Sequence, residues 1–186
     1  MKTTTKTVSD ILKHEHQMVL MVLQAAERQA AGIDQTGKAD TETINEILDF
    51  FRTFTDKCHH SKEEKLLFPK MQERGLPVGH GPIAVMLMEH DEGRRLLRAV
   101  SDNLDAAGRG EPQTAQVVRD SLLAYGELMR AHIDKEDNVL YPLAERILTP
   151  EDQRELIEAF DKVEAEEMGE GVHEKYHQLA HDLSGK

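Results

Sequence analysis

Apolar residues along the chain recur with the period of an α-helix rather than that of a strand. The first such stripe is formed by Leu12, Val19, Leu23, Ala26 and Ala30. A stripe with a 3.6-residue period predicts an amphipathic helix with one face turned to a core. No stretch shows the strict alternation that a half-buried strand requires, so the pattern predicts an all-α protein.

Glycine and proline clusters divide the chain into six predicted helices. The first begins at Ser9 or Asp10, a residue type that caps helices, and runs to about residue 31. The others span about residues 40–74, 82–107, 112–147 and 149–168, with a last short helix after the break at 169–171. Residues 32–37 are expected to form a loop. Pro69 is expected to bend the second helix or to end it early.

A helix-loop-helix unit is written twice and is followed by a C-terminal extension. Residues 1–148 are therefore predicted to form an up-down-up-down four-helix bundle, with residues 149–186 as a helical extension packed on it. Aromatic residues make up 4% of the chain and tryptophan is absent, while Leu, Met, Ala, Glu and Lys are abundant. That composition favours helices.

The repeat is clearest where polar residues interrupt the apolar stripes. Residues 58–69 return as residues 131–142, an offset of 73 positions. This offset pairs His59 with His132, Lys62 with Lys135, Glu63 with Glu136, Leu67 with Leu140, Phe68 with Tyr141 and Pro69 with Pro142. A second pair of segments, Glu15-His16 and Glu89-His90, recurs at an offset of 74 positions.

In each copy of the longer motif a histidine precedes a glutamate by four positions. On a helix this spacing puts an imidazole and a carboxylate on one face, a turn apart, where both can bind one metal ion. The first copy offers two registers, because His60 is also followed by a glutamate, Glu64. The second copy has Ile133 in place of His60, so we assign His59 and Glu63 to the site. His60, Glu64 and Asp137 are then expected to support the site or to lie at the surface.

Residue counts from the connecting loops place four histidines in one layer of the predicted bundle. Counted along the bundle at a rise of ~1.5 Å per residue, the two histidines of each helix pair differ in height by about one helical turn. The four residues are His16, His59, His90 and His132. His14 lies near a neighbouring stripe and stays an alternative to His16. One such motif alone is usually a solvated helix face, but four histidines with Glu63 and Glu136 at one level predict a metal site. Imidazole and carboxylate ligands together suit iron, manganese and zinc.

Charge and cysteine content narrow the possible partners and compartment. The formal net charge of −12 argues against binding to nucleic acid or to an anionic membrane. The single cysteine, Cys58, cannot form an internal disulfide, which fits a reducing cytoplasm. Cys58 is expected to be a small buried residue, although its position beside His59 leaves a redox role open. We expect neither a signal peptide nor a membrane-spanning segment.

Together these motifs resemble the hemerythrin-like, or HHE cation-binding, family over about residues 9–145. The resemblance implies a four-helix bundle with a non-haem di-iron centre that is bridged by two carboxylates and ligated by histidines. Carried across, Glu63 and Glu136 correspond to the bridges, and His16, His59, His90 and His132 to the terminal ligands. An oxo or hydroxo bridge between the iron ions would balance much of the remaining charge. The chain resembles the bacterial iron-centre repair branch more than the invertebrate oxygen carriers.

One position departs from the oxygen carriers of that family. They have a further histidine four residues before the ligand on the third helix, where this chain has Met86. His173 and His177 lie four residues apart in the last predicted helix and could supply that ligand or stand over a bound small molecule. A solvent-facing histidine stripe is the alternative interpretation. His181, one turn further along, is the least favoured of the three.

Three functions compete for such a site. The first is reversible binding of dioxygen or another diatomic molecule, and the second is enzymatic reduction of peroxide or nitric oxide. The third is iron storage, iron sensing or repair of iron centres without turnover of a small molecule. We favour diatomic or peroxide chemistry at a di-iron centre, with binding and turnover both open.

Overall fold

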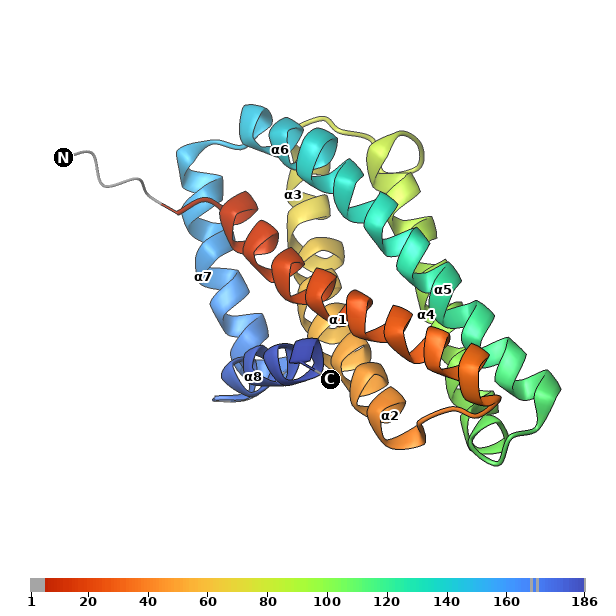
Figure 1. Cartoon of the computed structure of the whole chain (residues 1–186). Helices are drawn as coiled ribbons and strands as arrows, with labels where there is room; N and C mark the ends of the chain where they lie inside the picture. Colours follow the sequence, from red (N-terminus) through yellow and green to blue (C-terminus); the bar gives the residue numbers. More distant parts are fainter. Residues whose placement is uncertain (1–5, 168, 170, 186) are drawn as a thin grey trace.

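The computed structural model describes residues 6–167, 169 and 171–185, and within these ranges it contains helices and no strand. Long helical rods lie side by side, and the C-terminal helices cover one flank (Figure 1). The predicted all-α class is confirmed for the described residues.

The rods follow the predicted order, and two of them are built from several helical segments. The first rod is α1 (Val8–Thr36), and the third is α4 (Pro82–Gly108). The second joins α2 (Thr41–Phe50), the π-helical η1 (Phe51–His60) and η2 (Glu63–Leu67), and α3 (Phe68–Glu73). The fourth joins α5 (Pro112–Lys135), the π-helical η3 (Glu136–Leu140) and α6 (Tyr141–Ile147). The C-terminal helices are α7 (Pro150–Glu167) and α8 (Val172–Gly185).

Both ends of α1 differ from the prediction. Its cap is Thr7 rather than Ser9 or Asp10, and Thr7 exchanges hydrogen bonds with Asp10 in a capping box. The helix also continues through the segment expected to be a loop, because Ile33 is buried in the core. Gly37 then ends the helix in a left-handed conformation, with φ of 70°, and its N–H donates to the carbonyl of Ile33.

The two motif prolines lie inside their rods and are accommodated by π-helical turns. Pro69 therefore neither ends the second rod nor shortens it, since α3 continues to Glu73. In each copy the residue before the proline donates its N–H to the carbonyl five residues back, Phe68 to Glu63 and Tyr141 to Glu136. The wider turn relieves the clash that a proline ring makes with the preceding turn of an α-helix. The π turns η2 and η3 both begin at a glutamate assigned to the site.

Two hydrophobic clusters lie above and below the polar layer that holds the site. Along α1, Val8 and Leu12 belong to one cluster, and the larger cluster begins at Met18. Glu15 and His16 lie between them and are themselves buried. The polar layer is therefore enclosed by apolar side chains at both ends.

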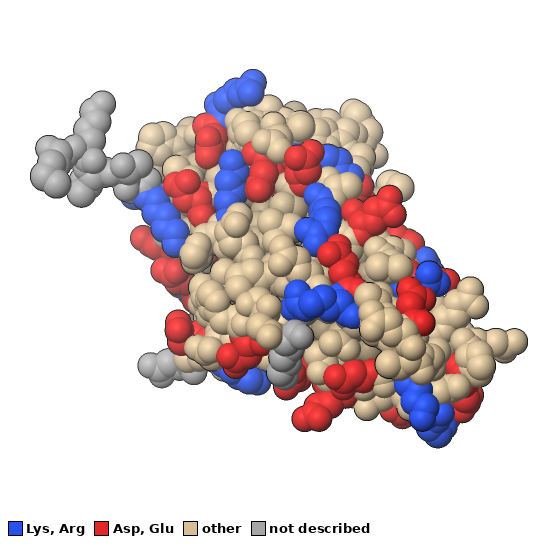
Figure 2. Space-filling view, viewed as in Figure 1, with Lys and Arg blue, Asp and Glu red and all other residues tan. Residues whose placement is uncertain are grey.

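The C-terminal helices pack on the bundle, as Figure 1 shows for the blue segments beside α1 and α2. Leu156 and Phe160 of α7 join the smaller cluster, and Tyr176, Ala180 and Leu183 of α8 join the larger one. None of the helices that the structure describes is long and apolar enough to cross a bilayer. On the face drawn in Figure 2, acidic and basic side chains are interspersed.

Candidate metal centre

Four buried histidines meet in two pairs at the centre of the bundle. The Nε2 atoms of His16 and His59 are 3.2 Å apart, and those of His90 and His132 are 3.1 Å apart. Each of the four side chains is at most 2% exposed. Two imidazole nitrogens bound at ~2.1 Å to one ion lie about 3 Å apart when they are adjacent ligands. Each pair therefore has the geometry of a chelate.

Two fully buried glutamates reach from one histidine pair to the other. Glu136 places Oε2 3.2 Å from Nε2 of His16 and Oε1 3.1 Å from Nε2 of His132. Glu63 places Oε2 3.8 Å from Nε2 of His59 and 3.5 Å from Nε2 of His90. Oε2 of Glu63 and Oε1 of Glu136 are buried and have no hydrogen-bond partner. Carboxylate oxygens in this position fit cations held by both pairs.

The charges of the layer also favour a cation. Burial and then repulsion from Glu136 raise the pKa of Glu63 well above its usual value. Burial alone would raise the pKa of Glu136 too, but His132 and His16 hold it well below its usual value. Burial would lower the pKa of His132, yet its carboxylate neighbours raise it to about 9. Two buried carboxylates that repel each other need a proton or a metal ion to balance their charge.

The outward nitrogen of each of these four histidines contacts a carboxylate. The Nδ1–carboxylate distances are 2.9 Å for His16 and Asp137, 2.8 Å for His59 and Glu15, 2.7 Å for His90 and Glu64, and 2.9 Å for His132 and Glu89. Such partners fix the ring and keep Nε2 turned toward the metal position. Glu64 and Asp137 thus support the site, the first of their two expected roles. The support from Glu15 and Glu89 is a feature that sequence reasoning missed, although their repeat beside His16 and His90 was a signal.

The repeated lysines of the motif hold two of these supporting carboxylates. Nζ of Lys62 lies 2.5 Å from Glu15 and 3.2 Å from Glu164 of α7, and Lys62 has no exposed surface. Burial would raise the pKa of Glu15, but His59 and Lys62 lower it to about 2. In the second copy Lys135 pairs with Glu89 in the same way. The lysines therefore keep the supporting carboxylates ionised.

Tyr141 breaks the symmetry between the two copies. Its hydroxyl donates to Oε1 of Glu63 at 2.8 Å and lies 3.3 Å from Nε2 of His16. Burial, followed by the nearby carboxylates, raises the pKa of this phenol well above its usual value, so the group stays protonated. Its counterpart Phe68 has no polar atom. The repeat identified the two aromatics as equivalent and gave no sign of this contact.

His60 lies inside the site, contrary to the expectation from the repeat. It is 4% exposed, and its ring stacks on that of His90 with a centroid distance of 3.8 Å. One ligand atom from each of His60, Glu63, His90 and His132 lies within 4.8 Å of the others. His60 has no counterpart in the second copy of the motif, so a comparison of the copies cannot indicate its place beside His90.

His173 and His177 lie apart from the six predicted ligands. A ligand atom of His173 is within 4.8 Å of Glu15 and Glu164, and its ring is 5.6 Å from that of Phe54. The ring of His177 is 5.5 Å from that of His14 on the exposed side of α1. The structure therefore groups these histidines outside the layer, and it favours His16 over His14 as the ligand from α1.

Cys58 is buried beside the site but does not have the character of a redox thiol. It is 1% exposed, and burial raises the pKa of its thiol to about 12. A thiol with such a pKa stays protonated and is a poor nucleophile. This supports the expectation of a small buried side chain.

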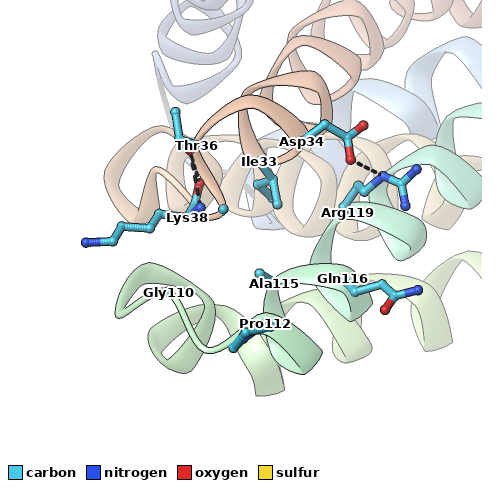
Figure 3. Close-up of a pocket in the computed structure, with 10 residues that line it drawn as sticks. Ile33, Asp34, Thr36, Lys38, Gly110, Pro112, Ala115, Gln116 and Arg119 are labelled. Carbon is cyan, nitrogen blue, oxygen red and sulfur yellow. Dashed lines mark hydrogen bonds and ion pairs between the residues drawn. The ribbon is translucent and has the colours of Figure 1, made fainter.

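The hollow drawn in Figure 3 is lined by none of the residues of the metal layer. It measures about 460 Å³ and lies between the end of α1 and the start of α5. Asp34 and Arg119 form an ion pair at its wall, with 2.8 Å between Oδ1 and Nε. Ile33 in this wall is 17 residues from His16 on the same helix, which corresponds to ~25 Å. The hollow therefore does not lead to the site.

The fold and the site together define a helical-bundle protein with a buried histidine–carboxylate site for cations. The family model of the hemerythrin HHE cation binding domain matches residues 7–144. The chain belongs to this family, which confirms the resemblance inferred from the motifs. Membership and the buried cluster indicate a protein that binds iron or a related cation.

Curated relatives are distant and longer than this chain. Uncharacterized proteins of Mycobacterium bovis and Mycobacterium tuberculosis are 23% identical over 164 residues, which cover 88% of this chain and 64% of each relative. The iron-sulfur cluster repair protein YtfE of Escherichia coli is 28% identical over 138 residues, which cover 71% of this chain and 60% of that protein. The chain thus spans less than two thirds of their length. No solved structure shows significant similarity to the chain.

Proposed function

We propose that the protein holds a pair of iron ions and binds, or reacts with, dioxygen, nitric oxide or peroxide there. His16 and His59 would hold one ion, and His90 and His132 the other. Glu63 and Glu136 would join them, and an oxo or hydroxo group would complete the bridge. The observation that carries the proposal is that both glutamates span both histidine pairs.

Ligand chemistry and family membership favour iron over other cations. Imidazole with carboxylate suits iron, and facing helices of a bundle are a known way to hold a metal pair. When bound, two iron ions can exchange electrons with dioxygen, nitric oxide or peroxide, which zinc cannot do. The residues of this chain would bind and orient the metal, keep water away and hold a proton at Tyr141.

The surroundings of the layer favour a very small ligand. The cavity next to His60 and His90 measures about 10 Å³, about the space that one water molecule needs. Two hydrophobic clusters enclose the layer from either end of the bundle. The hydroxyl of Tyr141 would offer a hydrogen bond to a ligand on the side of His16. An enclosed layer with so little free volume beside it suits a diatomic molecule or peroxide better than an organic substrate.

Iron-centre repair is the second candidate, and iron storage or sensing is the third. The name of the relative YtfE, an iron-sulfur cluster repair protein, is the observation that favours repair. A repair protein of this kind would deliver iron to a damaged cluster, whereas a storage or sensing protein would hold iron without turning over a small molecule.

The test is to mix the fully reduced, iron-loaded protein with dioxygen, nitric oxide and peroxide in separate rapid-mixing experiments. We expect a new optical band with at least one of the three. A band that disappears when the gas is removed would establish binding, whereas consumption of peroxide over many cycles would establish an enzyme. If none of the three changes the spectrum while iron is transferred to a protein with a damaged cluster, repair replaces our proposal.

A further inference from the structure

His60 shares its local arrangement with the four histidines already assigned. Its Nδ1 lies 3.3 Å from Oδ1 of Asp56, so it too has a carboxylate on the outward nitrogen. Its Nε2 is buried and has no hydrogen-bond partner. A buried ring nitrogen without a partner is costly, which sets His60 apart from an ordinary core histidine.

The position of His60 associates it with one histidine pair only. Its ring is stacked on that of His90, with an angle of 17° between the ring planes. Its ligand atom falls in one group with those of Glu63, His90 and His132, whereas His16, His59 and Glu136 form a separate group. His60 is therefore placed to add a nitrogen to the ion held by His90 and His132.

Arg94 links the supports of these two stacked rings. Its Nε donates to Oδ1 of Asp56, the support of His60, at 2.8 Å. Its Nη2 donates to Oε1 of Glu64, the support of His90, at 2.7 Å. One guanidinium thus orients both carboxylates and, through them, both rings. This is the arrangement expected where two neighbouring histidines must face one ion.

We propose that His60 is a third histidine ligand on the ion held by His90 and His132, and that the centre is therefore unequal. The inference rests on the proposed iron pair. The counterpart of His60 is the buried Ile133, which cannot bind a metal, so the ion at His16 and His59 has two histidines. The hydroxyl of Tyr141 lies 3.3 Å from Nε2 of His16, on the side that lacks this third histidine.

The substitution His60→Ile tests this directly, because it copies the residue that the second motif already has. We expect one of the two iron ions to be lost to a competing chelator at a concentration at least about tenfold lower than for the wild type. Mössbauer spectra of the wild type should show two unequal iron sites, and the difference between them should change in the variant, in which Tyr141 still distinguishes the two sides. His14→Ile, on the exposed side of α1, is the control and should change neither result.

A count of ligand nitrogens in the wild type does not depend on how well the variant folds. Electron–nuclear double resonance on the protein labelled with nitrogen-15 histidine, after one-electron reduction, should find five bound histidine nitrogens, one from each buried ring of the layer. Four would overturn the inference, as would unchanged iron retention and Mössbauer spectra in a folded His60→Ile protein. Failure of the wild type to hold an iron pair would instead overturn the proposed function.

Discussion

Individual side chains of the metal layer differ in what their loss should remove. An oxygen of Glu63 faces Nε2 of both His59 and His90, whereas Glu64 contacts the outward Nδ1 of His90. We expect Glu63→Ala to abolish retention of the iron pair, because a bridge is lost. Glu64→Ala should keep both ions with an affinity about 10- to 100-fold lower, the usual cost of losing a supporting carboxylate. Iron analysis after dialysis checks this, and equal retention in the two variants would show that Glu63 is not a bridge.

The hydroxyl of Tyr141 should affect reactivity more than metal binding. Tyr141→Phe removes the donor to Oε1 of Glu63 but none of the six proposed ligands. We expect iron content to stay the same and the rate of reaction with oxygen or peroxide to change. The metal-free variant should lose about 1–2 kcal/mol of unfolding free energy, because a buried carboxylate oxygen loses its partner.

Tyr176→Phe provides the matched control for that substitution. It removes a tyrosine hydroxyl that donates to Asp49 on α2, away from the metal layer. Its optical spectrum and reaction rates should match those of the wild type. Identical rates in Tyr141→Phe and Tyr176→Phe would mean that the Tyr141 hydroxyl does not act on the bound ligand.

The structure brings together the six residues that the repeat selected, but the repeat did not indicate the residues around them. A comparison of the two copies reveals only what they share. It therefore found the histidine–glutamate spacing and the common level of the four histidines along the bundle. It could not show that Glu15 supports His59, because these residues are 44 positions apart and their contact depends on how the rods pack. His60 and Tyr141 differ between the copies, so the comparison left His60 as a supporting or surface residue and gave Tyr141 no role.

At the scale of helical elements, the π turns show what periodicity alone cannot reveal. Apolar spacing predicted one helix through each motif, and proline predicted a disturbance at residue 69. The structure combines both, because a π turn precedes each proline and the rod continues. Each of these π turns spans only five residues, too few for apolar spacing to distinguish it from a turn of α-helix.

The packing of α7 makes the two motif lysines unequal. Lys62 is fully buried between Glu15 and Glu164 of α7, whereas Lys135 is 39% exposed. Lys62→Ala should destabilise the metal-free protein by about 3–5 kcal/mol, because it leaves a buried carboxylate without its partner. Lys135→Ala should cost about 1 kcal/mol or less, since water can replace the lysine. Urea unfolding of both variants checks this, and equal losses would contradict the role given to α7.

The terminal helix α8 is expected to stabilise the bundle rather than to bind the metal. Its Tyr176, Ala180 and Leu183 are buried in the larger cluster, so deleting residues 169–186 would open the core and disturb the site indirectly. The double substitution His173→Ala and His177→Ala avoids this problem. We expect this variant to retain its iron and its optical spectrum, because both rings lie outside the six-residue layer. A shifted spectrum would make one of these histidines a ligand.

At the scale of the whole molecule, duplication accounts for the centre and small differences account for its asymmetry. Two helix-loop-helix halves each bring a histidine pair, a glutamate and a lysine, and antiparallel packing joins them in one buried layer. The fold could be predicted because each half repeats the same pattern. The inequality of the halves arises from single positions, His60 against Ile133 and Tyr141 against Phe68.

The metal content of the purified protein tests the central claim most directly. Protein made in iron-replete cells should contain about two iron ions per chain, as expected for a bundle with facing carboxylate and histidine motifs. Its oxidised form should give the Mössbauer spectrum of a coupled iron pair without a ground-state electron paramagnetic resonance signal. One zinc ion per chain and no iron, from the same cells, would contradict the account.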